Sequence, residues 1–171
     1  MTRSVTKRLA CSLAAAGLAF SVVGVGAAAA DAGAGQQQLA AVRAATAKYH
    51  DVDAAIAAGY APTDECVPGM GYHYVNNALF GSLDPLAPTA LLYEANKNGQ
   101  LRLVGVEWLM ADADQDLSTD GDRPSLFGKV FDGPMPGHGP GMPVHYDLHA
   151  YVWQANPAGV LETWNVNVTC P

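Results

Sequence analysis

Residues 90–111 constrain the fold most, because they predict two antiparallel strands joined by a short turn. Two apolar runs, residues 91–94 and 101–109, flank the turn sequence N-K-N-G at 96–99. An Asn-Gly pair between two such runs is a strong signal for a β-hairpin. The second run is apolar on both faces, which is typical of a central strand.

Glu107 interrupts the apolar pattern of this second strand. On a regular strand it shares a face with Leu101, Leu103 and Leu109. A buried carboxylate is costly unless it has a partner, so Glu107 needs a cation, a proton or strong hydrogen-bond donors. We therefore treat Glu107 as a candidate functional residue.

Residues 133–153 hold three of the five histidines in the chain, His138, His145 and His149. In the first part, residues 133–143, a loose pattern occurs twice in which a methionine and a proline precede a histidine. Proline stiffens this loop, so that it can hold a ligand with little entropy left to lose. The alternative interpretation of the loop is a rigid surface turn.

Residues 144–153 fit two patterns. In a helix, His145 and His149 are neighbours at i and i+4 and form a good metal-binding pair. In a strand, both share one face with Asp147 and Tyr151, and the aromatic and β-branched content favours this form. The two histidines are then about 13 Å apart, at about 3.3 Å per residue. Unless the strand bends at Asp147, only one of them can be a direct ligand of a given metal.

The remaining elements predict an α+β domain with an N-terminal helix packed on a mostly antiparallel sheet, open or closed into a barrel. The helix covers residues 36–58, where apolar side chains recur every three or four residues before Gly59. The other predicted elements are a loop over 60–71, a strand over 72–75 that contains His73, a loop over 76–88, a short strand over 125–131 and a last strand segment over 160–170.

The N-terminus resembles a cleaved signal peptide, which predicts a secreted protein. Arg3, Lys7 and Arg8 precede an apolar stretch over 9–25, and small residues follow at 27–30. We predict a signal peptide over 1–30, a flexible lead-in over 31–38 and a single α+β domain over 39–171, with no membrane segment after cleavage.

Cleavage leaves two of the three cysteines, Cys66 and Cys170, in a compartment that permits oxidation. We expect them to form a disulfide, worth about 4–5 kcal/mol for a loop of about a hundred residues. Cleavage also leaves six lysines and arginines against 16 acidic residues. Such a charge disfavours nucleic acid and anionic membranes as partners.

A metal ion is the predicted partner, because several neutral imidazoles and a carboxylate are typical metal ligands. Zn, Cu, Mn and Fe fit these ligands, and Met70, Met135 and Met142 would add copper(I) if their sulfur atoms point inward. Whether the protein is an enzyme depends on an open coordination position, which is typical of catalytic metal sites. The candidate ligands are His73, Glu107, His138, His145 and His149, with Asp147 orienting an imidazole and with Tyr72 and Tyr151 as further neighbours.

Residues 112–122 contain five aspartates, and the first three are spaced as in a calcium loop. Leu117 and Arg123 occupy the positions where an EF-hand needs glycine and glutamate. Calcium binding is therefore one interpretation, and a solvated acidic turn is the other.

Two functions without a metal remain. Tyr72, Tyr74, Trp108, Tyr151 and Trp153 could line a pocket for a small organic molecule or a sugar. The domain could also have a structural or interaction role. There is no G-x-S-x-G motif to suggest a nucleophilic hydrolase, and nothing singles out Glu107 with Asp147 as a glycosidase pair.

The segments G-M-G-Y-H-Y-V-N at 69–76 and G-M-P-V-H-Y-D-L-H at 141–149 resemble a family of exported bacterial proteins, chiefly actinobacterial. The resemblance also includes residues 49–60 and the sequence L-V-G-V-E-W, and so it spans nearly the whole predicted domain. No reaction is assigned to this family, so the resemblance implies export and no particular chemistry.

Overall fold

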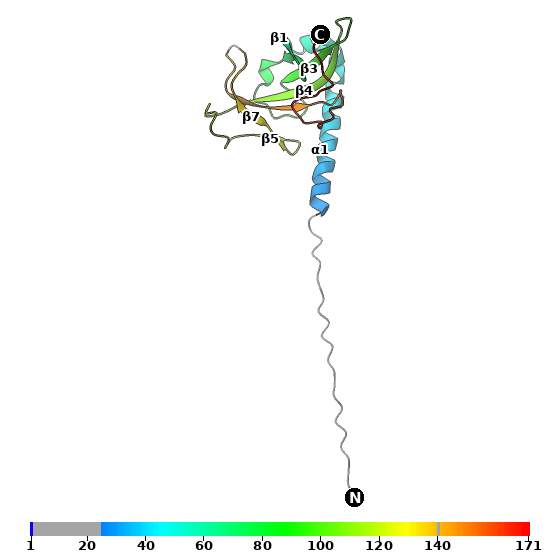
Figure 1. The fold of residues 1–171 in the computed structure, drawn as a ribbon, viewed down its shortest axis with the longest axis vertical. Helices are drawn as coiled ribbons and strands as arrows, with labels where there is room; N and C mark the ends of the chain where they lie inside the picture. The colour runs from blue at the N-terminus through cyan, green and yellow to red at the C-terminus, as the bar shows by residue number, and fades with distance from the viewer. Residues whose placement is uncertain (2–24, 140) are drawn as a thin grey trace.

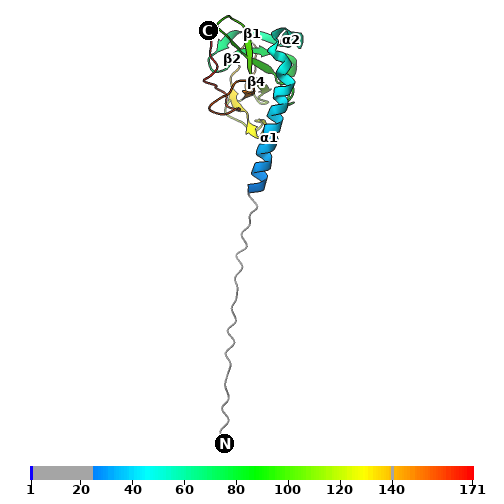
Figure 2. The ribbon, with the colours of Figure 1, turned by 90° about the vertical axis from the view of Figure 1, so that its right-hand side faces the viewer.

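One long helix packs against one face of an open antiparallel β-sheet (Figures 1 and 2), which confirms the predicted α+β class. The computed structural model describes Met1, residues 25–139 and residues 141–171, and most of the predicted signal peptide lies outside this part. The six strands of the sheet follow the order β1-β2-β3-β4-β8-β7, and a separate hairpin pairs β5 with β6. The sheet is not closed into a barrel.

The described residues form four helical elements and eight strands. The helical elements are α1 (Val25–Thr46), the 3-10 helix η1 (Ala47–His50), α2 (Val52–Ala57) and the 3-10 helix η2 (Asn77–Leu79). The strands are β1 (Ala61–Val67), β2 (Gly71–Val75), β3 (Ala90–Ala95), β4 (Leu101–Ala111), β5 (Ser125–Leu126), β6 (Lys129–Val130), β7 (Asp132–Met135) and β8 (His145–Ala150).

The main hydrophobic core lies between the helices and the sheet. Leu39 and Val42 of α1 contribute to it, as do Trp108 of β4 and Leu148 of β8. A buried hydrogen bond also joins the two layers, since the Tyr93 hydroxyl donates to the backbone carbonyl of Tyr49 over 2.6 Å. This face of the sheet is therefore filled by packing, and any site must lie on the other face.

The N-terminal helix differs from the continuous helix predicted over residues 36–58. The structure divides it at Asp51, whose extended backbone ends η1 and whose carboxylate accepts a hydrogen bond from the backbone N–H of Asp53. Asp51 thus caps α2, because aspartate competes for local backbone donors at helix starts. The predicted lead-in over 31–38 lies within α1.

The predicted hairpin is confirmed as β3 and β4, with one irregularity. Its register shifts by one residue at Val104, so that Tyr93 opposes Leu103 whereas Leu92 opposes Gly105. Leu103 consequently belongs to the core on the helix side, whereas Val104 joins a small second cluster. The expectation that Leu101 and Leu103 share a face with Glu107 was wrong, because a bulge reverses the alternation of side chains.

The segments that contain the two cysteines differ from the elements predicted there. The predicted loop over 60–71 contains the edge strand β1, which tolerates Pro62 because an edge strand leaves some backbone donors unpaired. The predicted strand over 160–170 is irregular; within it, the N–H of Asn165 donates to the carbonyl of Gly69. This contact joins the C-terminal segment to the turn between β1 and β2, and the predicted Cys66–Cys170 disulfide joins it to β1.

None of the described helices is both long enough and apolar enough to cross a membrane.

Candidate metal site

Strand β8 presents a row of polar side chains on the face of the sheet opposite the helices. Its alternate residues Tyr146, Leu148 and Ala150 belong to the main core. Side chains of a strand alternate between faces, so His145, Asp147 and His149 share the other face. The strand form of this segment is therefore correct, and the helix form is excluded.

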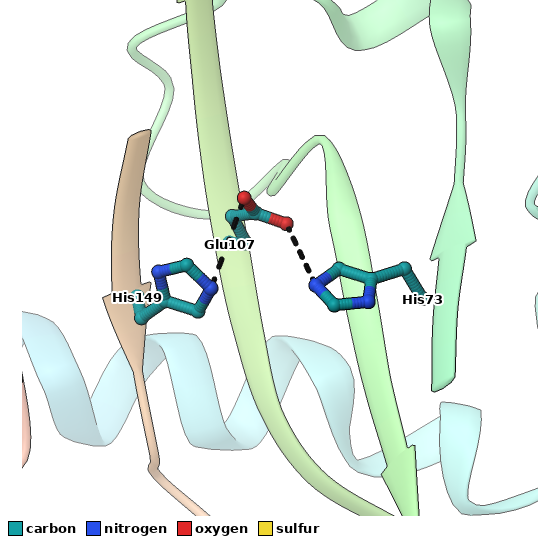
Figure 3. A group of neighbouring side chains, drawn as sticks. All are labelled: His73, Glu107 and His149. Atoms are coloured by element: carbon teal, nitrogen blue, oxygen red, sulfur yellow. Dashed lines mark ion pairs between the residues drawn. The ribbon is translucent and has the colours of Figure 1, made fainter. Parts of the chain in front are cut away.

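The sheet register brings Glu107 and two histidines together. Glu107 lies directly opposite His149 in the antiparallel pair β4–β8, and His73 reaches the same place from β2 across β3. The Nε2 atom of His73 lies 3.6 Å from Oε2 of Glu107, and the Nε2 atom of His149 lies 3.8 Å from Oε1 (Figure 3). One donor atom from each of the three residues lies within 4.8 Å of the other two.

These distances suit a shared metal ion better than direct hydrogen bonds. Both separations exceed the usual limit of about 3.2 Å for an N–H···O bond. Two ligand atoms that each lie about 2.1 Å from a tetrahedral zinc ion are about 3.4 Å apart. Small side-chain shifts therefore allow one ion to contact all three residues.

Burial controls the charges of this group. Burial, and then the neighbouring Asp147 carboxyl, raise the pKa of Glu107 well above its usual range. Burial is also the main cause that lowers the pKa of His149 to about 3 and the pKa of His73 to about 4. Without a metal, both imidazoles are neutral at pH 7, and burial favours the protonated form of Glu107. Neutral imidazole is the form that binds metals, and a metal ion would displace the proton of Glu107.

Asp147 lies on the far side of His149, as expected for a residue that orients an imidazole. Its Oδ1 atom lies 3.7 Å from Nδ1 of His149, while Nε2 of the same ring faces Glu107. Both ring nitrogens of His149 are buried and lack a hydrogen-bond partner among the described residues. A carboxylate behind a metal-binding histidine is a common supporting arrangement, because it fixes the tautomer and the ring orientation.

A cavity of about 1200 Å³ gives access to the group. His73 and Glu107 line it, and its wall also includes Asp132 and Asp147. The exposed Trp164 also lines it. A metal held by the three residues would thus have one side directed toward a space that water or a small molecule can enter.

The other predicted site residues occupy different places. The His145 side chain lies on the same face, but strand pairing puts it opposite Ala111, two register positions beyond Asp147. His138 lies in the loop beside His145, with 4.8 Å between the ring centroids. The rings of Tyr151 and His149 stack with their centroids 6.3 Å apart. Tyr72, in contrast, packs against the core on the helix side. The group closest to Glu107 therefore contains two of the four predicted histidines.

The five aromatic residues proposed for an organic ligand do not share one cavity. Tyr74 and Trp108 are buried in the main core, and Trp153 packs against it. Tyr151 belongs to the second cluster, and its hydroxyl donates to the carbonyls of Gly69 and Thr163. The five residues therefore do not form the aromatic pocket expected from the sequence, because strand alternation divides their side chains between the two faces of the sheet.

The acidic segment over 112–122 folds back on itself. Asp114 and Asp116 accept hydrogen bonds from the backbone N–H groups two residues further on, and Asp122 accepts one from the Tyr146 hydroxyl. Within the described part of the chain, no three carboxylates of this segment come within 4.8 Å of one another. Calcium binding here stays a prediction, and the turn geometry does not strengthen it.

Sequence reasoning missed Asp132. It pairs with Asp147 between β7 and β8, and its carboxylate accepts a hydrogen bond from the Thr163 hydroxyl. Burial, and then repulsion from Asp132, raise the pKa of Asp147 to about 7. The signal available in the sequence was weak: an acidic residue directly before the Gly-Pro loop that leads to three histidines.

The proton held by Asp147 should make the metal-free protein lose stability, relative to the variant Asp147→Asn, as the pH rises from 5 to 7. Folded Asp147 keeps its proton up to about pH 7, whereas an unfolded aspartate loses it near pH 4. The folded state therefore holds one more proton than the unfolded state between these values, and the stability from this proton falls by about 1.4 kcal/mol per pH unit. His73 and His149 act in the opposite direction, because unfolded histidine is charged below and around pH 6.5, but they are present in both proteins.

Urea unfolding in EDTA between pH 5 and pH 9 measures this dependence. The stability of the wild type minus that of Asp147→Asn should fall between pH 5 and pH 7 and change little above pH 8. A difference that is constant or rises between pH 5 and pH 7 would contradict the assignment of a protonated Asp147.

Comparison with known proteins finds no matching family model, no matching curated protein and no matching solved structure.

Proposed function

We propose that the protein binds one divalent transition-metal ion through His73, Glu107 and His149. The convergence of one donor atom from each of these residues on the sheet face opposite the helices carries the proposal. Glu107 and His149 are almost completely buried, and a cation explains why a central apolar strand retains a carboxylate there. Two imidazoles and one carboxylate fit Zn²⁺, Mn²⁺, Fe²⁺ or Cu²⁺.

The open side of the site favours catalysis over a purely structural role. Structural zinc sites are closed by four protein ligands, whereas catalytic sites use three and leave a position for water or substrate. His73 and Glu107 line the cavity, so the free position would face it. A metal there would lower the pKa of a bound water molecule, and Asp147 with Asp132 would be available to exchange protons nearby.

Export is part of the proposal. The Cys66–Cys170 disulfide supports it, since structural disulfides are typical of oxidising compartments. The basic and apolar N-terminal sequence agrees with the same interpretation.

Metal titrations of untagged protein test the proposal. Zn²⁺, Mn²⁺, Fe²⁺ and Cu²⁺ are added separately to chelator-treated protein, and binding is followed by calorimetry and by the melting temperature. We expect one tight site in the wild type and none in His73→Ala/His149→Ala. His50→Ala is the matched control, because His50 is exposed and lies on the helix side against Trp153. Absence of binding by all four ions, or equal binding by the double variant, would refute the proposal.

A further inference from the structure

The segment from the end of β7 to the start of β8 contains two copies of the sequence M-P-x-H, which the proposed site does not use. The first copy covers residues 135–138 and the second covers residues 142–145. Each copy supplies one thioether and one imidazole. Thioether sulfur is a soft ligand that favours copper(I), and imidazole also binds copper.

The structure brings the two copies together. The rings of His138 and His145 lie with their centroids 4.8 Å apart in an edge-to-face arrangement. Met135 is paired with His145 across the two strands, which puts both side chains on the same face of the sheet. Met135, His138 and Met142 also line the same cavity.

His145 has the environment of a metal ligand. The residue is completely buried, and its Nδ1 atom contacts the carbonyl of Pro143 at 3.2 Å. A proton on Nδ1 leaves the lone pair on Nε2, and this atom is buried without a hydrogen-bond partner in the described part of the chain. Metal-binding histidines typically donate their second ring N–H to a backbone carbonyl or a carboxylate in this way.

The loop backbone holds Met142 near His138. Gly137 lies so close to Met142 that a Cβ atom built on Gly137 would come within 2.0 Å of the Met142 carbonyl oxygen. The Met142 N–H in turn donates to the carbonyl of Gly139 over 3.1 Å. Only glycine fits at 137, and its absence of a side chain lets the two copies of the repeat approach.

We propose that Met135, His138, Met142 and His145 form a second metal site, selective for copper(I), beside the site of Glu107. The two sites share the cavity but no ligand. The second site requires neither His73 nor His149 and does not depend on the function proposed above. Copper(I) prefers the softer set because it contains two sulfur atoms, whereas Zn²⁺ prefers the carboxylate-containing set.

The test uses chelator-treated full-domain protein and copper(I) under anaerobic conditions, with bicinchoninate as the competing ligand. The variant Met135→Leu/Met142→Leu keeps similar apolar volume and removes both sulfur atoms. We expect its copper(I) affinity to fall by more than about 100-fold, beyond the 10- to 100-fold typical of losing a supporting group alone. Its Zn²⁺ affinity should stay at the wild-type value, and His73→Ala should keep copper(I) while losing Zn²⁺.

X-ray absorption at the copper edge supplies an independent measurement. The wild type should show sulfur bound to copper, and the double leucine variant should show none. Wild-type copper(I) affinity in the leucine variant, or copper bound without sulfur in the wild type, would overturn the proposal. Loss of copper(I) in His73→Ala would place the ion at the first site and would overturn it as well. If the leucine variant does not fold, His138→Ala replaces it, because His138 lies at an exposed loop position. We expect His138→Ala to lower the copper(I) affinity as well, and wild-type copper(I) affinity in this variant would overturn the proposal.

Discussion

Replacing Glu107 with glutamine should lower the Zn²⁺ affinity by more than about 100-fold, since it removes the only negatively charged ligand of the proposed site. The same change should stabilise the metal-free protein at pH 8. The reason is that folded Glu107 has a raised pKa, so burial in the apolar strand opposes its ionised form at this pH. Gain of stability together with loss of binding is typical of a functional residue.

Glu94→Gln is the matched control for this prediction. Glu94 lies on the neighbouring strand β3 and accepts hydrogen bonds from Arg102 and Thr169. Burial alone would raise the pKa of Glu94, but these bonds lower it. We expect the control variant to lose up to about 1 kcal/mol, as for other ion pairs with an exposed partner, without any change in Zn²⁺ binding. Calorimetry and urea unfolding measure both effects, and a Glu107→Gln protein that still binds Zn²⁺ with wild-type affinity would contradict the site.

The second large effect concerns the disulfide. The variant Cys66→Ser/Cys170→Ser should lose about 4–5 kcal/mol of unfolding free energy in the chain-entropy model. The two cysteines are 104 residues apart, so the bond restricts most of the domain when it is unfolded. It also joins β1 to the C-terminal segment that covers the site face.

Urea unfolding of the oxidised wild type and of the serine variant measures this loss. A reducing agent should lower the stability of the wild type and leave the serine variant unchanged. A difference smaller than about 1 kcal/mol would show that the bond contributes little beyond the packing it accompanies.

Local patterns predicted the elements whose side chains alternate regularly. The turn at 96–99 and its apolar flanks identified β3 and β4, and the aromatic run near His149 identified β8. Edge strand β1 was missed, because prolines are also typical of loops. The segment over 160–170 has strand-like composition, but its backbone bonds to loops such as that at Gly69.

Part of the site could also be predicted from local sequence patterns. Glu107 was identifiable because charge is unusual in a central strand, and the spacing of His145 and His149 indicated that only one could reach a given metal. The choice of His149 depends on the register of β4 against β8. The approach of His73 depends on the strand order β2-β3-β4-β8, which no local pattern contains.

Anomalous X-ray diffraction from crystals soaked with Zn²⁺ tests the central claim most directly. We predict one strong peak at about 2.0–2.2 Å from Nε2 of His73, Nε2 of His149 and a carboxylate oxygen of Glu107. The peak should disappear in Glu107→Gln and persist in His50→Ala. A peak elsewhere, or no peak while the three side chains keep their positions, would contradict the account.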